Sequence, residues 1–171
     1  TSKNYDDLIV KFEKIDNIPN DKKLVLIDKS NGEIYDLFIK NKYLIKKGYT
    51  KNIGRKFSLI HGPTKWVENT VSEIIQSIPN EYILGQNFPN PFNPLTTIQY
   101  QIPMDQLVVL KIYNLIGQEI ITLVNKEQFA GNYNIIWNGK DKQNKQVSSG
   151  TYFYTLKTKN FKISKKMMLL K

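Results

Sequence analysis

Apolar and polar residues alternate with a period of two along most of the chain, which is typical of half-buried β-strands. The alternating stretches are separated by segments such as DNIPNDK and KSNG, whose glycine, proline, asparagine and aspartate residues favour tight turns. This pattern predicts an all-β protein. The expected strands cover residues 7–15, 23–28, 33–39, 42–46, 55–60, 95–102, 107–114, 119–125, 132–139, 151–158 and 161–170.

One segment has helical spacing instead. In WVENTVSEIIQSI, residues 66–78, the apolar residues recur at intervals of three or four. Two interpretations remain open here, an amphipathic helix or a loosely ordered connection. In either case we expect residues 66–82 to link two domains.

The two sides of this linker predict two β-sandwich-like domains. Residues 1–65 contain five short strands, which form a small β-sandwich or the C-terminal part of a larger one, because small sheets with open edges are marginal alone. Residues 83–171 predict a sandwich of about seven strands, the size of an immunoglobulin or fibronectin type III module. The side chains expected to face its core are Ile98, Tyr100, Ile102, Val108, Leu110, Ile112, Ile120, Leu123, Ile135, Trp137, Tyr152, Tyr154, Leu156 and Met168.

A proline-rich stretch precedes the first strand of the second domain. In LGQNFPNPFNPLTTIQYQIP, residues 84–103, each proline fixes its own φ and restricts the residue before it. We expect residues 88–94 to be extended and stiff, with Phe88 and Phe92 covering the end of the core.

The chain ends in a basic stretch with an apolar tail, KISKKMMLLK. Lysines on an edge strand discourage aggregation, which is one interpretation of this stretch. A terminal strand that a receptor captures by backbone pairing is the other.

Five blocks together resemble a known family. In chain order they are LGQNFPNPFNPLTTIQYQIP, LVVLKIYNLIGQEIITLVN, AGNYNIIWNGKD, VSSGTYFYTLKT and KKMMLLK. They resemble the type A C-terminal sorting domain of bacterial type IX secretion, which is similar to the immunoglobulin-like domain of flagellar hook-capping proteins.

One residue departs from the family pattern. Asn144 stands where the family usually has glycine, and asparagine tolerates the left-handed backbone region better than most residues.

The resemblance assigns roles to three groups of residues. The first group, which we call the proline block, is Pro89, Asn90, Pro91, Phe92, Asn93 and Pro94. The core and turn motif is Gly117, Gly131, Tyr133, Trp137, Asp141, Gly150 and Tyr152. The terminal signal is Lys165, Lys166, Met167, Met168, Leu169, Leu170 and Lys171.

The resemblance implies a role in protein targeting rather than a catalytic activity. A protein with this domain is expected to pass through the periplasm, to cross the outer membrane by the type IX translocon and to be processed by its surface sortase. It is then secreted or held at the cell surface on anionic lipopolysaccharide.

Two other functions stay open at the level of the sequence. A structural or adhesive subunit would keep its immunoglobulin-like domain and self-associate through strand edges. A carbohydrate-binding module would need Tyr43, Tyr49, Trp66 and Tyr133 to form an exposed aromatic platform.

The composition limits the classes of binding partner that we expect. The formal net charge is +10, but Arg55 is the only arginine among 25 basic residues, whereas bidentate recognition of phosphates and base edges favours arginine. We therefore expect no nucleic-acid partner. Cysteine is absent, so neither disulfides nor thiolate metal sites are expected. No apolar stretch approaches the roughly 20 residues needed to cross a bilayer, and the start without methionine is typical of a mature product or a fragment.

The sequence predicts no catalytic site and no cofactor. His61 is the only histidine, and it is expected in a turn without a partner set for general base chemistry. Asp141 and Asn144 could contribute to a calcium site, although two oxygen ligands are too few to define one.

Overall fold

The structure is a computed structural model that describes residues 8–13, 19–40, 42–45 and 56–171. The chain divides into two compact units, Thr1–Ile78 and Pro79–Lys171, which we call unit 1 and unit 2 and describe separately. Strands dominate both units, so the expected all-β class is confirmed.

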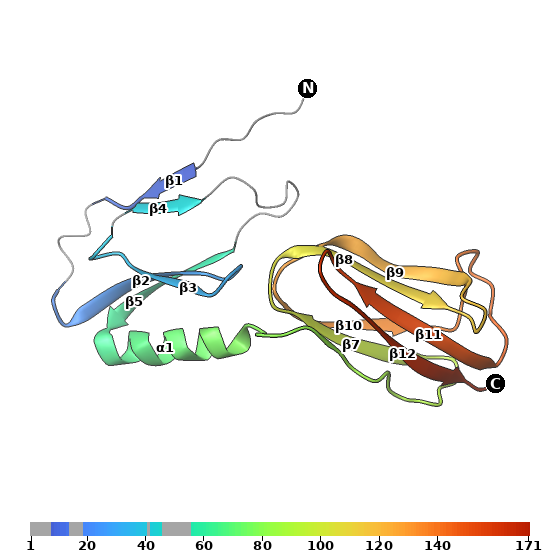
Figure 1. Cartoon of the computed structure of the whole chain (residues 1–171). Helices are drawn as coiled ribbons and strands as arrows, with labels where there is room; N and C mark the ends of the chain where they lie inside the picture. The colour runs from blue at the N-terminus through green and yellow to red at the C-terminus, as the bar shows by residue number, and fades with distance from the viewer. Residues whose placement is uncertain (1–7, 14–18, 41, 46–55) are drawn as a thin grey trace, which may run out of the picture. The chain divides into compact units, whose positions relative to one another are not determined.

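The described residues of unit 1 form two antiparallel sheets and one helix (Figure 1). Three strands form a sheet in the order β3-β2-β5, and β1 pairs with β4. The bounds are β1 Leu8–Lys11, β2 Lys22–Asp28, β3 Glu33–Asp36, β4 Lys42–Ile45, β5 Phe57–Pro63 and α1 Thr64–Ser77.

Strand β2 is the centre of unit 1 because both of its faces are buried. Leu24 and Leu26 pack on one face with Leu37 and Tyr43, whereas Val25 and Ile27 pack on the other face against α1. A strand covered on both sides lacks the polar alternation of a half-exposed strand. This explains the apolar run LVLI at residues 24–27.

Helix α1 belongs to unit 1, which corrects the predicted linker over residues 66–82. Its apolar stripe, Val67, Val71, Ile74 and Ile75, packs on Val25, Ile27 and Ile60 of the sheet. The helix ends at Ser77 because Pro79 disfavours helical backbone at Ile78, whose φ and ψ are −83° and 121°.

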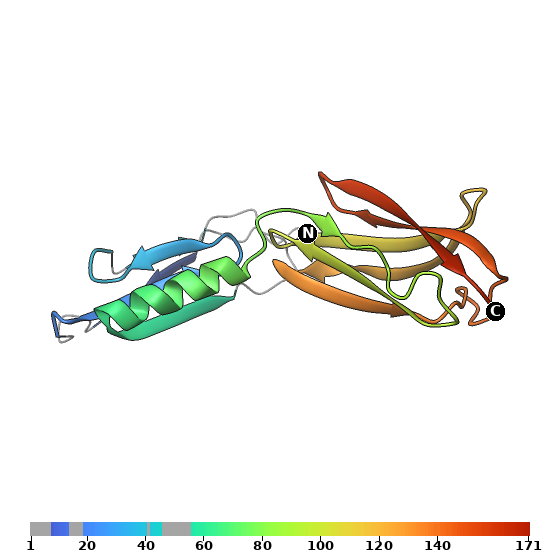
Figure 2. The same ribbon diagram turned by 90° about the horizontal axis from the view of Figure 1, so that it is seen from below.

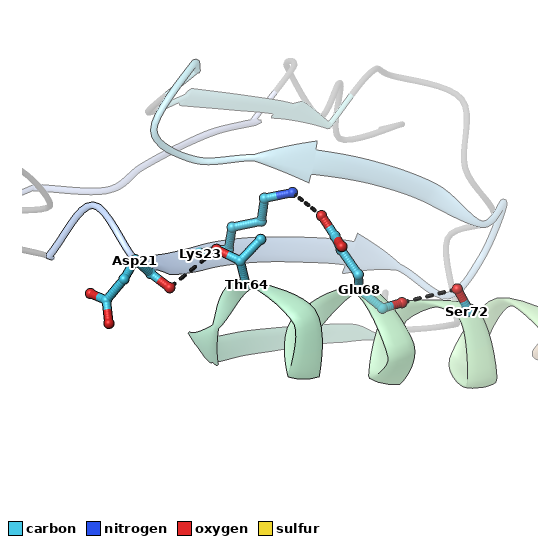
Figure 3. Close-up of polar contacts among 5 residues, drawn as sticks. All are labelled: Asp21, Lys23, Thr64, Glu68 and Ser72. Carbon is cyan, nitrogen blue, oxygen red and sulfur yellow. Dashed lines mark hydrogen bonds and ion pairs between the residues drawn. The ribbon is translucent and has the colours of Figure 1, made fainter.

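Polar contacts fix the start of α1 against β2 (Figure 3). The Thr64 N–H and hydroxyl both donate to the Asp21 carbonyl at 3.1 Å, and Lys23 Nζ lies 2.5 Å from Glu68 Oε1. The Ser72 hydroxyl donates to the Glu68 carbonyl within the helix. The carboxylate of Glu68 raises the pKa of Lys23, mainly through this hydrogen bond.

Unit 2 is a two-layer sandwich of antiparallel strands (Figures 1 and 2). One sheet has the order β10-β7-β6 and the other has the order β12-β11-β8-β9. The bounds are β6 Ile83–Leu84, β7 Thr96–Ile102, β8 Gln106–Tyr113, β9 Glu119–Gln128, β10 Gly131–Trp137, β11 Gly150–Lys157 and β12 Lys162–Leu169. Only β6 lacks a counterpart among the predicted strands, since two residues carry no period.

The core of unit 2 follows most of the predicted alternation, although Ile120 and Ile135, which were expected in the core, are only partly buried. Met168 is exposed, and the core contains its neighbours Met167 and Leu169. In β9 the buried apolar residue is Val124 rather than Leu123, which is partly buried. Register shifts between β8 and β9 change which residues point inward, and a pattern of strict alternation does not reveal them.

Tyrosine hydroxyls close the corners of the sandwich. The Tyr152 hydroxyl donates to the Ser148 carbonyl at 2.8 Å, just ahead of β11. This is the tyrosine corner of immunoglobulin-like domains, in which the hydroxyl bonds to the backbone a few residues upstream. The Tyr133 hydroxyl makes the same kind of bond to the Phe129 carbonyl.

Candidate functional site at the C-terminal strand

The terminal strand β12 divides the predicted terminal signal into two sets. Met167 and Leu169 are fully buried in the core of the sandwich. Met168 and Leu170 point outward and are 42% and 49% exposed. Lys166 and Lys171 are also exposed, and Lys165 is half-buried. The strand therefore anchors itself with alternate residues and presents the others to solvent.

The segment before β7 is tied to the centre of the other sheet. The Tyr154 hydroxyl of β11 donates to the Gly85 carbonyl at 2.8 Å and accepts the Asn87 N–H at 2.9 Å. The Asn87 side chain in turn donates to the Pro89 carbonyl and to the Thr96 hydroxyl. Gly85, Asn87 and Tyr154 thus connect residues that lie almost 70 positions apart in the chain.

The same segment covers the outer edge of β12 from Lys166 onward (Figures 1 and 2). Gln86 Nε2 donates to the Lys166 carbonyl, and Asn90 Oδ1 accepts the Met168 N–H, each at 2.9 Å. The Phe92 N–H donates to the Met168 carbonyl at 3.0 Å, and the Leu170 N–H donates to the Phe92 carbonyl at 2.9 Å. These four hydrogen bonds saturate the outward backbone groups at Met168, and we call the arrangement the clamp.

The proline block is bent rather than extended, which corrects the prediction for residues 88–94. Bends occupy residues 89–91 and 93–94, and the Phe88–Pro89 and Asn90–Pro91 peptide bonds are cis. Phe92 is 2% exposed and its ring lies 5.5 Å from that of Trp137, whereas Phe88 is 79% exposed. Only one of the two predicted phenylalanines therefore covers the end of the core.

A small hollow lies where the three sequence blocks meet. It has a volume of about 180 Å³ and is lined by Asn90, Pro91, Thr151, Lys166, Met167 and Met168. Lys166 is the charged residue of this lining, and within the described residues it makes no ion pair. An apolar floor beside this lysine suits a short apolar group next to a carboxylate or phosphate.

The sequence did not single out Gln86, Asn87 or Thr151 as functional residues. Gln86 and Asn87 lie in the proline-rich stretch as ordinary polar residues, and their contacts to Lys166 and Tyr154 join distant parts of the chain. No local pattern marks such partners. The resemblance placed Gly150 and Tyr152 on either side of Thr151, and this was the only available pointer.

The remaining motif residues lie in turns and in the core, away from this hollow. Gly117, a residue of the core and turn motif, has a φ of 78° in the turn between β8 and β9. The Trp137 indole N–H donates to the Lys140 carbonyl at 2.9 Å. Asp141 Oδ1 accepts the N–H groups of Gln143 and Lys145, and Asn144 has a φ of 63°. Asn144 thus adopts the left-handed conformation that was expected of it.

Other candidate residues lie away from the hollow or outside the described residues. His61 is exposed within β5 rather than in a turn. Tyr43 is buried in unit 1, which removes it from an exposed aromatic platform, and the Tyr133 ring stacks on Tyr100 at 5.3 Å. Tyr49 lies outside the described residues. In the part of the chain that the structure describes, no group of three or more histidine, aspartate or glutamate side chains could hold a metal ion.

Comparisons with known proteins bear on unit 2. Residues 95–161 match the family model of the FlgD Ig-like domain. Unit 2, a two-layer sandwich of antiparallel strands, is thus similar to an immunoglobulin-like domain over these residues. The matched region begins just before β7 and ends just before β12, so it lies within the sandwich.

Two solved structures from Porphyromonas gingivalis are also similar to this chain. PorZ, described as an essential bacterial surface component of the type-IX secretion system, is 14% identical with a TM-score of 0.40 over 86% of this chain and 16% of its own. The crystal structure of dimeric latent PorU gives 14% identity and a TM-score of 0.42 over 90% of this chain and 16% of its own. This chain thus spans about a sixth of their length. A search of curated proteins finds no match, and none of the described helices is long and apolar enough to cross a membrane.

Proposed function

We propose that unit 2 is a non-catalytic sorting module that directs a larger exported protein through the type IX system to the cell surface. The five sequence blocks that resemble the type A sorting domain support this proposal, and so does the immunoglobulin-like fold of residues 95–161. The observation that carries it is the division of β12 into buried anchors and exposed residues. Met167 and Leu169 hold Lys166, Met168, Leu170 and Lys171 at defined positions on a folded surface.

The clamp changes how a receptor would read this signal. Capture of residues 166–170 by backbone pairing would require the clamp to open, because Asn90 and Phe92 already bond the outward groups of Met168. We therefore propose that the translocon reads exposed side chains of a folded domain. Unpaired lysines beside apolar methionine and leucine side chains would suit an acidic, partly apolar groove on the translocon or its surface sortase. They would also suit anionic lipopolysaccharide.

The test is secretion of a reporter fused to residues 79–171 in a bacterium with a type IX system. Unit 2 has its own core, which makes this a suitable fusion. The double variant Met168→Ser and Leu170→Ser removes exposed apolar side chains and leaves the buried anchors in place. We expect it to accumulate in the periplasm while the parent fusion reaches the surface.

A matched control uses apolar residues of unit 2 with similar exposure, Met104→Ser with Leu107→Ser, which are 51% and 46% exposed. This control should be secreted like the parent. If both double variants are secreted equally, or both are retained equally, the terminal strand is not the signal. Deletion of residues 165–171 is a weaker test, because it removes Met167 and Leu169 from the core and opens the clamp.

The mass of the native protein separates sorting from a structural role. If the module is removed after transport, the surface form lacks unit 2, with a new terminus near the boundary at Pro79. A surface protein that retains residues 79–171 in full would instead favour the structural or adhesive subunit.

A further inference from the structure

The four edge strands of unit 2 differ in how they are protected. Unpaired edges of sheets are templates for another strand, and proteins usually block them with charges, bulges, very short strands or covering segments. Strand β12 carries lysines and is covered by the clamp from Lys166 onward. Strand β9 has two register shifts and charged residues, and β6 is only two residues long. The fourth edge strand, β10, has none of these devices in the part of the chain that the structure describes.

Strand β10 is uncharged, regular and exposed at its free edge. Its sequence GNYNIIW contains no charged residue and no proline, although 23% of the chain is charged. It pairs with β7 over seven residues without a register shift, from Gly131↔Ile102 to Trp137↔Thr96. Ile136 is 65% exposed, and Asn132 and Asn134 are exposed beside it.

The pairing pattern shows which backbone groups of β10 are open. In β7, Thr97 exchanges hydrogen bonds with Phe88 and the Gln99 carbonyl accepts the Gly85 N–H, so the odd residues of β7 face β6. The even residues of β7 therefore face β10 and pair with its odd residues. The N–H and C=O groups of Asn132, Asn134 and Ile136 point away from the sheet, and within the described residues they make no hydrogen bond.

We propose that this edge binds the same edge of a second copy of the chain. Antiparallel pairing about a two-fold axis at Asn134 places Asn134 opposite its own copy and Asn132 opposite Ile136 of the other copy. Three pairs of residues then exchange six hydrogen bonds, which satisfy every open group on both edges. The two three-stranded sheets become one six-stranded sheet with an isologous interface.

Charge and side-chain chemistry agree with a second copy as the occupant. A chain of net charge +10 repels itself, but β10 brings no like charges together at this interface. The Asn134 amides face each other as donor and acceptor, and Ile136 covers an uncharged neighbour. Because one pair of strands buries little area, the association is expected to be weak and dependent on concentration. This inference does not rest on the proposed sorting function.

A single-cysteine experiment tests the register, because the chain contains no cysteine of its own. In the proposed dimer the two Asn134 Cα atoms lie about 5.5 Å apart, within the range that a disulfide spans. The full-length Asn134→Cys variant should therefore form a disulfide-linked dimer under mild oxidation. The Ile136→Cys variant should form no disulfide-linked dimer, since the two copies of residue 136 are offset by four residues, about 14 Å. Equal crosslinking of both variants, or none of Asn134→Cys, would overturn the proposal.

Sedimentation of the full-length protein without cysteine provides the second readout. We expect the average mass to rise above 19.9 kDa with concentration at about 0.15 M salt, where charges are screened beyond about 8 Å. Asn134→Lys should abolish this rise, because it places two ammonium groups face to face. Its exposed position leaves the fold intact, which circular dichroism checks.

The control is Gln99→Lys, which adds the same charge to the neighbouring residue of β7, opposite Asn134. Strand β7 is paired on both sides, so this variant should still dimerise through the edge. A monomeric wild-type protein at all concentrations contradicts the proposal. Loss of the dimer in both lysine variants also contradicts the proposal. In that case the second copy would contact the hollow of about 360 Å³, whose lining includes Gln99, Asn132 and Asn134.

Discussion

The two edge strands β12 and β10 both belong to unit 2 but handle their open backbone groups in opposite ways. At β12 the chain supplies its own covering segment, and Gln86, Asn90 and Phe92 take the places that a further strand would occupy. At β10 the described residues supply no such cover, and the exposed side chains are amides and isoleucine. The comparison shows that a strand's lysines do not by themselves indicate how it meets a partner. The strand with lysines is closed by the chain itself, and the uncharged strand is open.

The largest expected loss of stability is found by comparing the two phenylalanines of the segment that covers β12. Phe92→Ala removes a buried ring that packs on Trp137, and it should lower the free energy of unfolding of unit 2 by about 3–5 kcal/mol. Phe88→Ala should change it by less than about 0.5 kcal/mol, because Phe88 is exposed. Urea denaturation followed by tryptophan fluorescence measures both. A Trp66→Phe background leaves Trp137 as the sole reporter of unit 2.

Similar costs for the two alanine variants would show that the proline block does not seal the core as described. They would also remove the distinction between a covered and an open edge.

Tyr154→Phe tests the bonds that hold the covering segment in place. The variant loses the donor to the Gly85 carbonyl and leaves the buried Asn87 N–H without an acceptor. We expect a loss of about 2 kcal/mol, since an unsatisfied buried group costs about 1–3 kcal/mol. Amide hydrogen exchange should also become faster at Met168 and Leu170, whose N–H groups lie in the clamp. Unchanged exchange at both residues would mean that Tyr154 does not position the clamp.

High pH should weaken unit 2 through the same hydroxyl group. Burial raises the pKa of Tyr154 above its ordinary value near 10. The unfolded chain then loses this proton at lower pH than the folded chain, so the contribution to stability is complete below pH 10 and falls as the pH rises further. The slope from this group is at most about 1.4 kcal/mol per pH unit.

Burial also raises the pKa of Tyr100 to about 12, so other tyrosines add to the total. The contribution of Tyr154 is the difference in slope between the parent protein and Tyr154→Phe, measured by urea denaturation between pH 9 and pH 11. Equal slopes would show that Tyr154 does not titrate differently on folding.

The smallest expected changes in stability concern two asparagines, one at each edge. Asn90→Ala removes the acceptor for the Met168 N–H and should cost about 1 kcal/mol. Asn134→Ala removes a side chain that has no hydrogen-bond partner among the described residues, and it should change stability by less than about 0.5 kcal/mol. The same denaturation assay measures both. A larger cost at Asn134 than at Asn90 would reverse the assignment of covered and open edges.

Much of the candidate site was accessible to sequence reasoning, but its assembly was not. The resemblance singled out the proline block, the residues around Thr151 and the terminal strand, and all three meet at one hollow. The expectation that residues 88–94 are extended was wrong because proline restricts φ but does not set the direction of the chain, which the burial of Phe92 decides. The assignment of Met168 to the core was wrong by one position, and in a strand one position exchanges the two faces.

The sequence alone determined the class of the fold, the strands of unit 2 and the blocks that resemble a sorting domain. These depend on local periodicity, turn residues and motifs, all of which lie within short stretches of chain. Only the tertiary structure decided that α1 packs on unit 1, that the proline block covers β12 and that β10 remains open. Each of these outcomes depends on which distant backbone and side-chain groups satisfy one another, and a pattern along one segment contains no information about its partner in space.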